Sequence, residues 1–564
     1  MLCRSLFPLA GIMILKRLVD LLTGTPSVDF PVRLLILYIS LVSLLLLLDD
    51  LFSIAGRYYA KVQSGRLGLH IMGMIHSHSM KLGLSSFEDP RFHELLGRAS
   101  GDAAWRPASV VSDMVLLLKG ILSFIAMAII LSRFSILILV IILVSFIPAY
   151  AARGISSRNM YRSRPEQAHY TRKWQYFSWL LTAERPAREV KLFQLGEFFD
   201  SLFRSHYARA TEVELNALRK GNRIEYVAAL FKTLIFAGII IFFSISLVRG
   251  HITAGELAMY LVAFRQAVVY LRDSVAGLSG LGEDRLFLRD LFDFLDRKEE
   301  ITATEPVTDP PEFSGDIEIS GLTFYYPGSN IPALKDINLK IAKGEKIAIV
   351  GPNGSGKTTL VKLLCRLYDP ATGEIRYSGV PVVNIDPLKY RRCFSVVFQD
   401  FMLYYLSVRE NIGLGDLSRD PGDERLRQIF SGAGFDLFTD SLKNGFDTQL
   451  GHLDEEGREL SWGEWQKIAI IRALFREAPV LILDEPSSSL DSESEYAVIS
   501  HLDDITAGRT TVLISHRLSN VAGADRIVVM DHGTVAECGT HEELMKRGGL
   551  YHSMYTKQKN LYYH

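Results

Sequence analysis

The sequence is poor in features that mark several protein classes. Its 564 residues include only four cysteines, Cys3, Cys365, Cys393 and Cys538, and their spacing fits no metal site. We therefore interpret them as reduced thiols rather than as a disulfide framework. The formal net charge is −1, so no excess of basic residues supports a nucleic-acid-binding face, and we expect no nucleic acid partner. A chain of this length exceeds one hydrophobic core, which predicts at least two domains.

Hydrophobicity is concentrated in the first half of the chain, although the mean hydropathy of the whole is only +0.16. A helix needs about 20 residues to cross a hydrocarbon layer of roughly 30 Å. Buried helices of a soluble domain are the alternative, but tight polar turns separate paired runs of spanning length. The predicted spans lie at about 33–50, 109–131, 135–152, 234–248 and 255–271, with a shorter apolar run ahead of Lys16 and Arg17.

Charge asymmetry predicts the orientation of these spans. The long connections, at about 57–107 and 153–226, carry many basic residues, whereas the short ones carry few. The positive-inside rule makes the long connections cytoplasmic, and we expect them to extend the helices into the cytosol. A signal peptide is the alternative for the N-terminus, but no convincing cleavage site follows. We expect six spans, the first lacking its cytoplasmic beginning.

Composition changes near residue 300, where a charged segment rich in proline and threonine reads as a linker. We predict an all-α transmembrane domain at 1–295, a linker at 296–314 and an α/β P-loop nucleotide-binding domain at 315–564.

The apolar strand KIAIV runs directly into GPNGSGKTT, residues 351–359. Glycines in this motif let backbone N–H groups face phosphate oxygens, and the following helix presents its positive end. The predicted nucleotide-binding residues here are Gly351, Pro352, Asn353, Gly354, Ser355, Gly356, Lys357, Thr358 and Thr359.

In the P-loop, Lys357 would reach the β- and γ-phosphates and Thr358 would ligate Mg²⁺. Two further apolar strands end in polar residues. PVLILDEP ends in Asp484, placed to hold Mg²⁺, and Glu485, placed to polarise the attacking water. TTVLIS leads to His516, which alone would more often be structural but here is expected at the γ-phosphate. Parallel strands deliver such residues to one edge of a sheet, so the sequence predicts an ATP-hydrolysing site there.

These motifs, in this order, resemble those of ATP-binding-cassette exporter half-transporters, and the resemblance covers nearly the whole chain. It implies that Tyr326 in FYYPG stacks on adenine and that Gln399 in VVFQD senses the Mg²⁺ site. It also implies that DEPSSSLD ends in the D-loop residue Asp491 and that His516 is the switch histidine. Residues 85–100 and 180–199 are similar to the intracellular loops, beside which coupling helices dock on the ATPase domain. The family dimerises, with each ATP held between one half's P-loop and the other half's signature motif.

The signature motif departs from the family pattern L-S-G-G-Q. Here it reads Leu460, Ser461, Trp462, Gly463 and Glu464. Ser461 and Gly463 match the positions that reach the partner's γ-phosphate, whereas Trp462 brings a large ring where small size lets two backbones approach. An altered signature beside intact Glu485 and His516 is expected of the catalytically competent half of a heterodimer. A homodimer that tolerates Trp462 is the alternative.

The sequence contains less information about the transported compound. Arg265 lies about ten residues into the last predicted span, near the bilayer centre, where a charge usually faces a cavity or a partner. It would meet an anionic or polar cargo, or else form an interhelical ion pair. The membrane loops look most like those of peptide and lantibiotic-type exporters, so we expect ATP-driven export of a peptide or another amphipathic compound. A lipid or drug exporter and a non-transporting regulatory half remain the alternatives.

Overall fold

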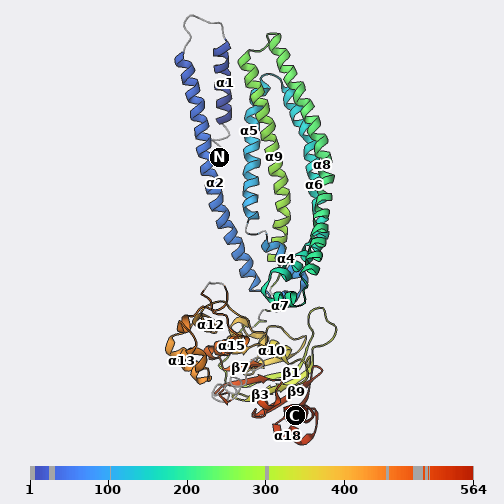
Figure 1. Cartoon of the computed structure of the whole chain (residues 1–564), viewed down its shortest axis with the longest axis vertical. Helices are drawn as coiled ribbons and strands as arrows, with labels where there is room; N and C mark the ends of the chain where they lie inside the picture. Colours follow the sequence, from blue (N-terminus) through green and yellow to red (C-terminus); the bar gives the residue numbers. More distant parts are fainter. Residues whose placement is uncertain are drawn as a thin grey trace. The chain divides into compact units, whose positions relative to one another are not determined.

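We describe the protein from a computed structural model (Figure 1). The structure describes residues 7–23, 32–101, 103, 105–298, 301, 304–305, 307–452, 456–486, 500–501, 506 and 508–562. The chain forms two compact units. The first contains residues 1–79 and 94–296, and the second contains residues 80–93 and 297–564.

Long helices make up the first unit (Figure 1). Within it, α1 and α2 run side by side, as do α5 and α9, and α6 and α8. Short helices occupy the connections between the long ones. The helices are α1 (Phe7–Thr23), α2 (Val32–Ser79), α4 (Pro90–Gly101), α5 (Arg106–Ser132), α6 (Ile136–Thr182), α7 (Glu184–Leu192), α8 (Gly196–Val248) and α9 (Ala254–Leu295).

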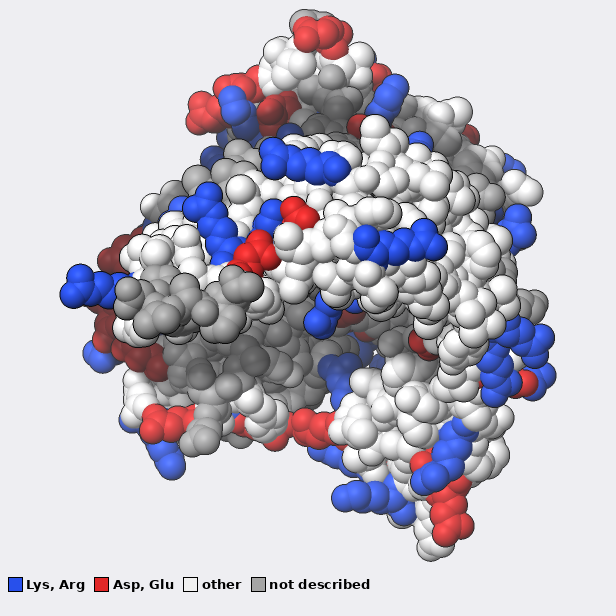
Figure 2. All heavy atoms as spheres, turned by 90° about the horizontal axis from the view of Figure 1, so that it is seen from above, with Lys and Arg blue, Asp and Glu red and all other residues white. Residues whose placement is uncertain are grey.

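Three of the described helices are long and apolar enough to cross a membrane: Val32–Ser79, Arg106–Ser132 and the Glu225–Val248 part of α8. Ile136–Pro148 in α6 is a shorter apolar stretch. The expected spans near the N-terminus and at 255–271 lie in α1 and α9, which do not combine that length and apolarity. Uncharged side chains make up most of the face drawn in Figure 2. These helices account for the predicted spans at 33–50, 109–131 and 234–248, and the helical membrane domain predicted from the sequence is confirmed.

The first unit is held by close helix packing around buried apolar residues. Met127, Leu131, Phe243 and Ala263 are fully buried in its core. At Gly120 in α5, an added Cβ would lie 2.8 Å from the Tyr270 carbonyl oxygen of α9, so only glycine permits this approach of the two backbones. Small residues at such contacts let membrane helices pack closely without a hydrophobic driving force.

Two sheets form the frame of the second unit. The four-stranded antiparallel sheet has the order β2-β1-β4-β5, and the six-stranded sheet has the order β10-β9-β3-β8-β7-β6. In the larger sheet β9, β3, β8, β7 and β6 are parallel, and β10 pairs antiparallel with β9. The strands are β1 (Ile317–Phe324), β2 (Leu334–Ile341), β3 (Lys346–Val350), β4 (Thr372–Tyr377), β5 (Val380–Pro381), β6 (Phe394–Val397), β7 (Val480–Asp484), β8 (Thr510–Ile514), β9 (Arg526–Asp531) and β10 (Thr534–Gly539).

Continuous apolar runs explain the parallel strands, because these strands are buried on both faces. Every residue of β7 and β8 is buried. Helices cover the sheet, and two hydrophobic clusters pack around it. The helices of this unit are α3 (Leu84–Glu88), α10 (Lys357–Leu364), α11 (Pro387–Arg391), α12 (Val408–Gly413), α13 (Asp423–Gly432), α14 (Asp436–Asp440), α15 (Trp462–Arg476), α18 (His541–Arg547) and α19 (Leu550–Tyr562), with short 3₁₀ turns at Val382–Asn384, Gly445–Asp447 and Leu518–Val521.

Residues 80–93 belong to the second unit although they follow a membrane helix. Leu84 packs against the hydrophobic cluster of the small sheet, and Glu88 Oε1 accepts a hydrogen bond from Lys362 Nζ at 3.3 Å. This segment overlaps the 85–100 region that resembles a family intracellular loop. The end of the predicted linker also packs here, because Phe313 is buried and stacks on Tyr377 with a centroid distance of 5.0 Å.

Candidate functional site

The order of the larger sheet brings four chain segments to one edge. β3 leads into residues 351–356, β8 into His516, β7 into Glu485, and β6 towards Gln399. Ligand sites of parallel sheets lie outside the carboxyl ends of the strands. A cavity of about 790 Å³ lies at this edge. It is lined by Tyr326, Ala333, Asn353, Gly354, Ser355, Gly356, Lys357, Thr358, Thr359, Gln399, Glu485 and His516.

The P-loop requires glycine at defined positions. Gly351, Gly354 and Gly356 have φ of 149°, 76° and 100°, which L side chains rarely adopt. A Cβ on Gly356 would also lie 2.6 Å from Leu334 Cδ2. The loop ends at α10, whose first three residues line the cavity. The N-terminus of a helix favours an anion.

Lys357 is buried at the start of α10 and turns back over the loop. Its Nζ donates to the carbonyl oxygens of Gly351 and Pro352, each at 3.0 Å. Burial lowers the pKa of Lys357, and the carboxylates of Glu485 and Asp484 oppose that shift. The neighbouring Ser355 hydroxyl is buried and makes no hydrogen bond with the described residues. Both groups suit a polyphosphate, which offers many acceptor oxygens.

Thr358 and Asp484 meet across the loop. Thr358 Oγ1 donates to Asp484 Oδ2 at 3.1 Å, while Asp484 Oδ1 is buried with no hydrogen-bond partner among the described residues. Burial raises the pKa of Asp484 to about 6, although the hydrogen bond from Thr358 acts in the opposite direction. A buried carboxylate oxygen without a donor beside a threonine hydroxyl suits a hard divalent cation such as Mg²⁺.

Glu485 is held by two of the predicted catalytic residues. His516 Nε2 lies 2.7 Å from Glu485 Oε1, and Gln399 Nε2 donates to Glu485 Oε2 at 3.2 Å. Burial and the nearby Lys357 ammonium lower the pKa of His516, and Glu485 opposes them. Glu485 has φ of 55°, uncommon for a residue with a side chain, and its N–H donates to the Ile514 carbonyl at 2.9 Å. Strained backbone of this kind is often found at functional sites.

Tyr326 lines the cavity beside Thr359 of α10. Its hydroxyl is 3.0 Å from Thr359 Oγ1, and its ring contacts Phe324 and Tyr368 edge-on. Lys362 Nζ lies 5.6 Å from the ring centroid. The ring is therefore fixed at the cavity lining, where a flat base could stack on it.

The signature motif begins α15. Ser461 is the N-cap residue, and its hydroxyl accepts from the Glu464 N–H at 3.3 Å. Glu464 Oε2 accepts in return from the Ser461 N–H at 2.8 Å, which completes a capping box. Glu464 Oε1 accepts from Arg458 Nη2 at 2.8 Å. Gly463 lies in the first turn of the helix. The acidic residue at 464 is thus explained by helix capping.

Trp462 is the first residue of α15, and its ring packs on Phe401 with a centroid distance of 5.0 Å. Phe401 is largely buried and lies two residues beyond Gln399. Trp462 itself stays 45% exposed. The indole therefore lies partly against its own chain, with nearly half of its surface open.

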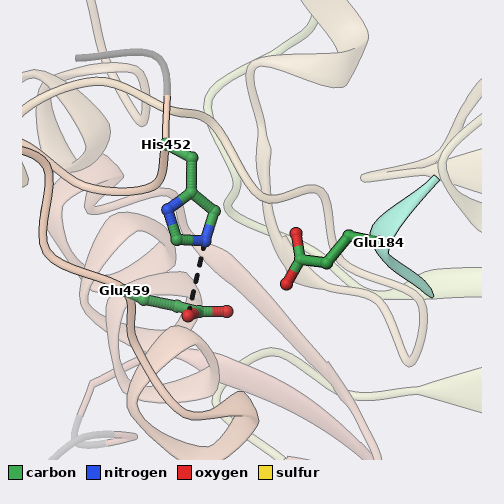
Figure 3. A group of neighbouring side chains, drawn as sticks. All are labelled: Glu184, His452 and Glu459. Atoms are coloured by element: carbon green, nitrogen blue, oxygen red, sulfur yellow. Dashed lines mark ion pairs between the residues drawn. The ribbon is translucent and has the colours of Figure 1, made fainter. Parts of the chain in front are cut away.

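Asp491, the expected D-loop residue, lies outside the described residues. The structure brings most of the other predicted site residues together at the cavity, and Gly351, Pro352 and Asp484 contact the lining residues Lys357 and Thr358, while Ser461 and Gly463 do not line the cavity. His452 and Glu459 form a separate exposed pair, with 3.3 Å between Nε2 and Oε2 (Figure 3). Arg265 is exposed on α9 and forms no ion pair with the part of the chain that the structure describes.

One contributor to the site was not predicted from the sequence. Gln466 is buried in α15, and its Nε2 donates to the Glu485 carbonyl at 3.1 Å. A polar residue on the buried face of an otherwise apolar helix is the signal that could have identified it. The contact ties the signature helix to the backbone of Glu485.

Comparison with known proteins agrees with this geometry. The ABC transporter family model matches residues 334–488. The chain is 29% identical to the subtilin transport ATP-binding protein of Bacillus subtilis over 557 residues, which cover 98% of this chain and 89% of that protein. It is 28% identical to the nisin transport ATP-binding protein of Lactococcus lactis subsp. lactis, over 98% of this chain and 91% of that one.

Two further similar proteins match different shares of this chain. An ATP-dependent lipid A-core flippase of Hahella chejuensis is 38% identical over 311 residues, 55% of this chain and 52% of its own. The solved structure of a bacterial Atm1-family ABC exporter with ATP bound matches with a TM-score of 0.79 and 24% identity, over 99% of this chain and 97% of that one. The latter supports the fold. Taken together with the P-loop cavity and the helical domain before it, the comparisons show an ABC transporter ATPase domain fused to an N-terminal helical membrane domain, in a chain whose relatives are ABC exporters.

Proposed function

We propose that the cavity at the carboxyl edge of the larger sheet binds and hydrolyses ATP to drive export of a peptide or another amphipathic compound. The observation that carries the catalytic part is the meeting of Lys357, Glu485 and His516 in one cavity beside the P-loop. The phosphates would lie on the P-loop N–H groups and Lys357, and the adenine on Tyr326. Phosphoryl transfer to water needs such positioning and charge neutralisation more than covalent chemistry.

Each polar residue has a distinct proposed role. Glu485 would orient the attacking water, since its carboxylate is already placed by Gln399 and His516. His516 would donate a hydrogen bond to the γ-phosphate. Thr358 and Asp484 would hold Mg²⁺, with Gln399 near it, and the ion when bound would neutralise charge on the β- and γ-phosphates.

The exporter would work as a dimer in the bilayer, and we propose that the partner is a different half-transporter. Ser461 and Gly463 would contact the nucleotide bound by the partner, and the partner's signature would complete this chain's cavity. The large, 45% exposed ring of Trp462 supports this assignment, because it stands where two backbones must approach. The site completed by Trp462 would then close less well than the other.

The peptide assignment rests on similarity along the whole chain. The relatives named for subtilin and nisin transport align over 98% of this chain, whereas the flippase named above aligns over 55%. A lipid exporter is the second candidate, favoured by the higher identity of that shorter alignment. The expected location is the inner or cytoplasmic membrane, with the ATPase domain in the cytosol.

A matched pair of substitutions tests the catalytic proposal. In the assembly that turns over ATP in lipid, Glu485→Gln should lower kcat by at least about a hundredfold while ATP is still bound, because the water loses its orienting carboxylate. Glu424→Gln, at an exposed position of α13, is the control and should keep kcat. Equal turnover in the two variants would refute the role of Glu485.

A further inference from the structure

The C-terminal helix reaches the loop that carries His516. The side-chain amide of Gln558, in the last turns of α19, donates through Nε2 to the His516 carbonyl oxygen. Its Oε1 accepts from the Leu518 N–H at 2.9 Å. One carboxamide thus bonds the backbone on both sides of Arg517, as a neighbouring strand would.

The helix that presents Gln558 is itself firmly placed. Glu537 of β10 accepts from the N–H groups of Leu550 and Tyr551, at 2.6 and 3.1 Å, and so caps the start of α19. Tyr551 is fully buried, and its hydroxyl lies 2.8 Å from His541 Nδ1. Because the first turn of α19 is anchored in this way, the position of Gln558 seven residues later is fixed by the helix.

The loop that carries His516 needs contacts from other elements because it links a strand to a 3₁₀ turn. β8 ends at Ile514 and the 3₁₀ turn begins at Leu518, so residues 515–517 lie outside any strand or helix. Within the loop, the Arg517 N–H donates to Ser515 Oγ at 3.0 Å. The Gln558 amide adds bonds from outside the loop, at the residue whose ring lies 2.7 Å from Glu485.

We infer that Gln558 is a positioning residue for catalysis, which fixes the His516 backbone so that its imidazole meets Glu485 and the bound nucleotide. The inference rests on the proposed role of His516. It adds a task for the C-terminal helix, which contributes no residue to the cavity lining. The hydrogen bonds of Gln558 do not take part in binding ATP but set the geometry of the catalytic residues. Their loss should therefore change kcat more than KM.

The test uses the full chain, reconstituted in lipid in the assembly that turns over ATP. Gln558→Leu should lower kcat about tenfold and leave KM within about twofold, as expected for loss of one or two positioning hydrogen bonds. Asn560→Leu removes an exposed amide from the same helix and should keep kcat within about twofold. Gln558→Asn, which is too short to bridge both groups, should give an intermediate rate and serves if the leucine variant folds poorly.

A double-mutant cycle separates positioning from simple stabilisation. In a His516→Ala background, Gln558→Leu should have no further effect on kcat, and hydrogen exchange of the Leu518 amide should accelerate in Gln558→Leu but not in Asn560→Leu. Independent, multiplying losses would show that Gln558 is merely structural, and an unchanged kcat in Gln558→Leu would equally overturn the inference. If His516→Ala alone keeps full turnover, the proposed role of His516 fails, and the inference about Gln558 fails with it.

Discussion

At the scale of single residues, Asp484 is buried, and this burial raises its pKa to about 6. An acid whose pKa is higher in the folded than in the unfolded protein destabilises the fold whenever it is ionised. This penalty is complete above pH 6 and shrinks as the pH falls from 6 towards 4. Nucleotide and Mg²⁺ would offset it, since a bound cation favours the ionised form.

Asp484→Asn should therefore stabilise the protein without nucleotide at pH 7.5, by up to about 3 kcal/mol in unfolding free energy. The gain should shrink towards pH 4, and the stabilisation by Mg²⁺-ATP should be lost. Thermal unfolding between pH 4.5 and 8 measures both effects, with the exposed Asp420→Asn as control. A gain that does not depend on pH would contradict the assigned cause.

The sequence predicted the residues of this site better than their contacts. A strand followed by GPNGSGKT has few alternative structures, because its glycines must adopt positive φ and its helix follows at once. The left-handed backbone of Glu485 and its bond to His516 could not be predicted. They depend on the pairing of β7 with β8, which is a property of the sheet and not of either segment.

At the scale of elements, the start of α15 shows that a residue which departs from the family pattern can still stabilise its own helix. Glu464 replaces glutamine, and both side chains can accept from the Ser461 N–H in a capping box. The structure places the charge of Glu464 against Arg458 and the N-terminus of the helix. Gln558 was missed because nothing near it in sequence is catalytic.

Glu464→Ala should destabilise α15 by about 1 kcal/mol, because the Ser461 N–H and Arg458 lose their acceptor. Glu464→Gln keeps the acceptor for Ser461 and should cost less than half as much. Denaturant unfolding followed by the fluorescence of Trp462 and Trp465 would report on this helix. Equal losses in the two variants would show that the carboxylate charge, and not the capping box, stabilises the helix.

At the scale of the whole molecule, the long helices were predictable because apolar runs of spanning length have few alternatives. The sequence also predicted a charge, Arg265, within the span expected at 255–271, but it could not predict the surroundings of that side chain. The interhelical ion pair considered for Arg265 is absent among the described residues, where its side chain is exposed. An exposed guanidinium on α9 favours contact with a cavity or a partner over a structural pairing.

Arg265→Ala should weaken the stimulation of ATP turnover by an acidic amphipathic peptide, with a half-saturating concentration about tenfold higher. Arg265→Lys should retain most of the response, because it keeps the charge. Arg249→Ala, at the exposed end of α8, is the control. If Arg265→Ala changes neither the rate nor the peptide preference, Arg265 has no part in cargo recognition.

The most direct measurement is Mg²⁺-dependent ATP hydrolysis by this chain alone in lipid, with Glu485→Gln as the blank. We expect wild type to bind ATP without turnover above the blank, and Trp462→Gly to restore turnover that Glu485→Gln again abolishes. This result would mean that the cavity is competent and that the tryptophan prevents self-assembly of a working site. Wild-type turnover equal to that of Trp462→Gly would contradict the account and establish a homodimer that tolerates the ring.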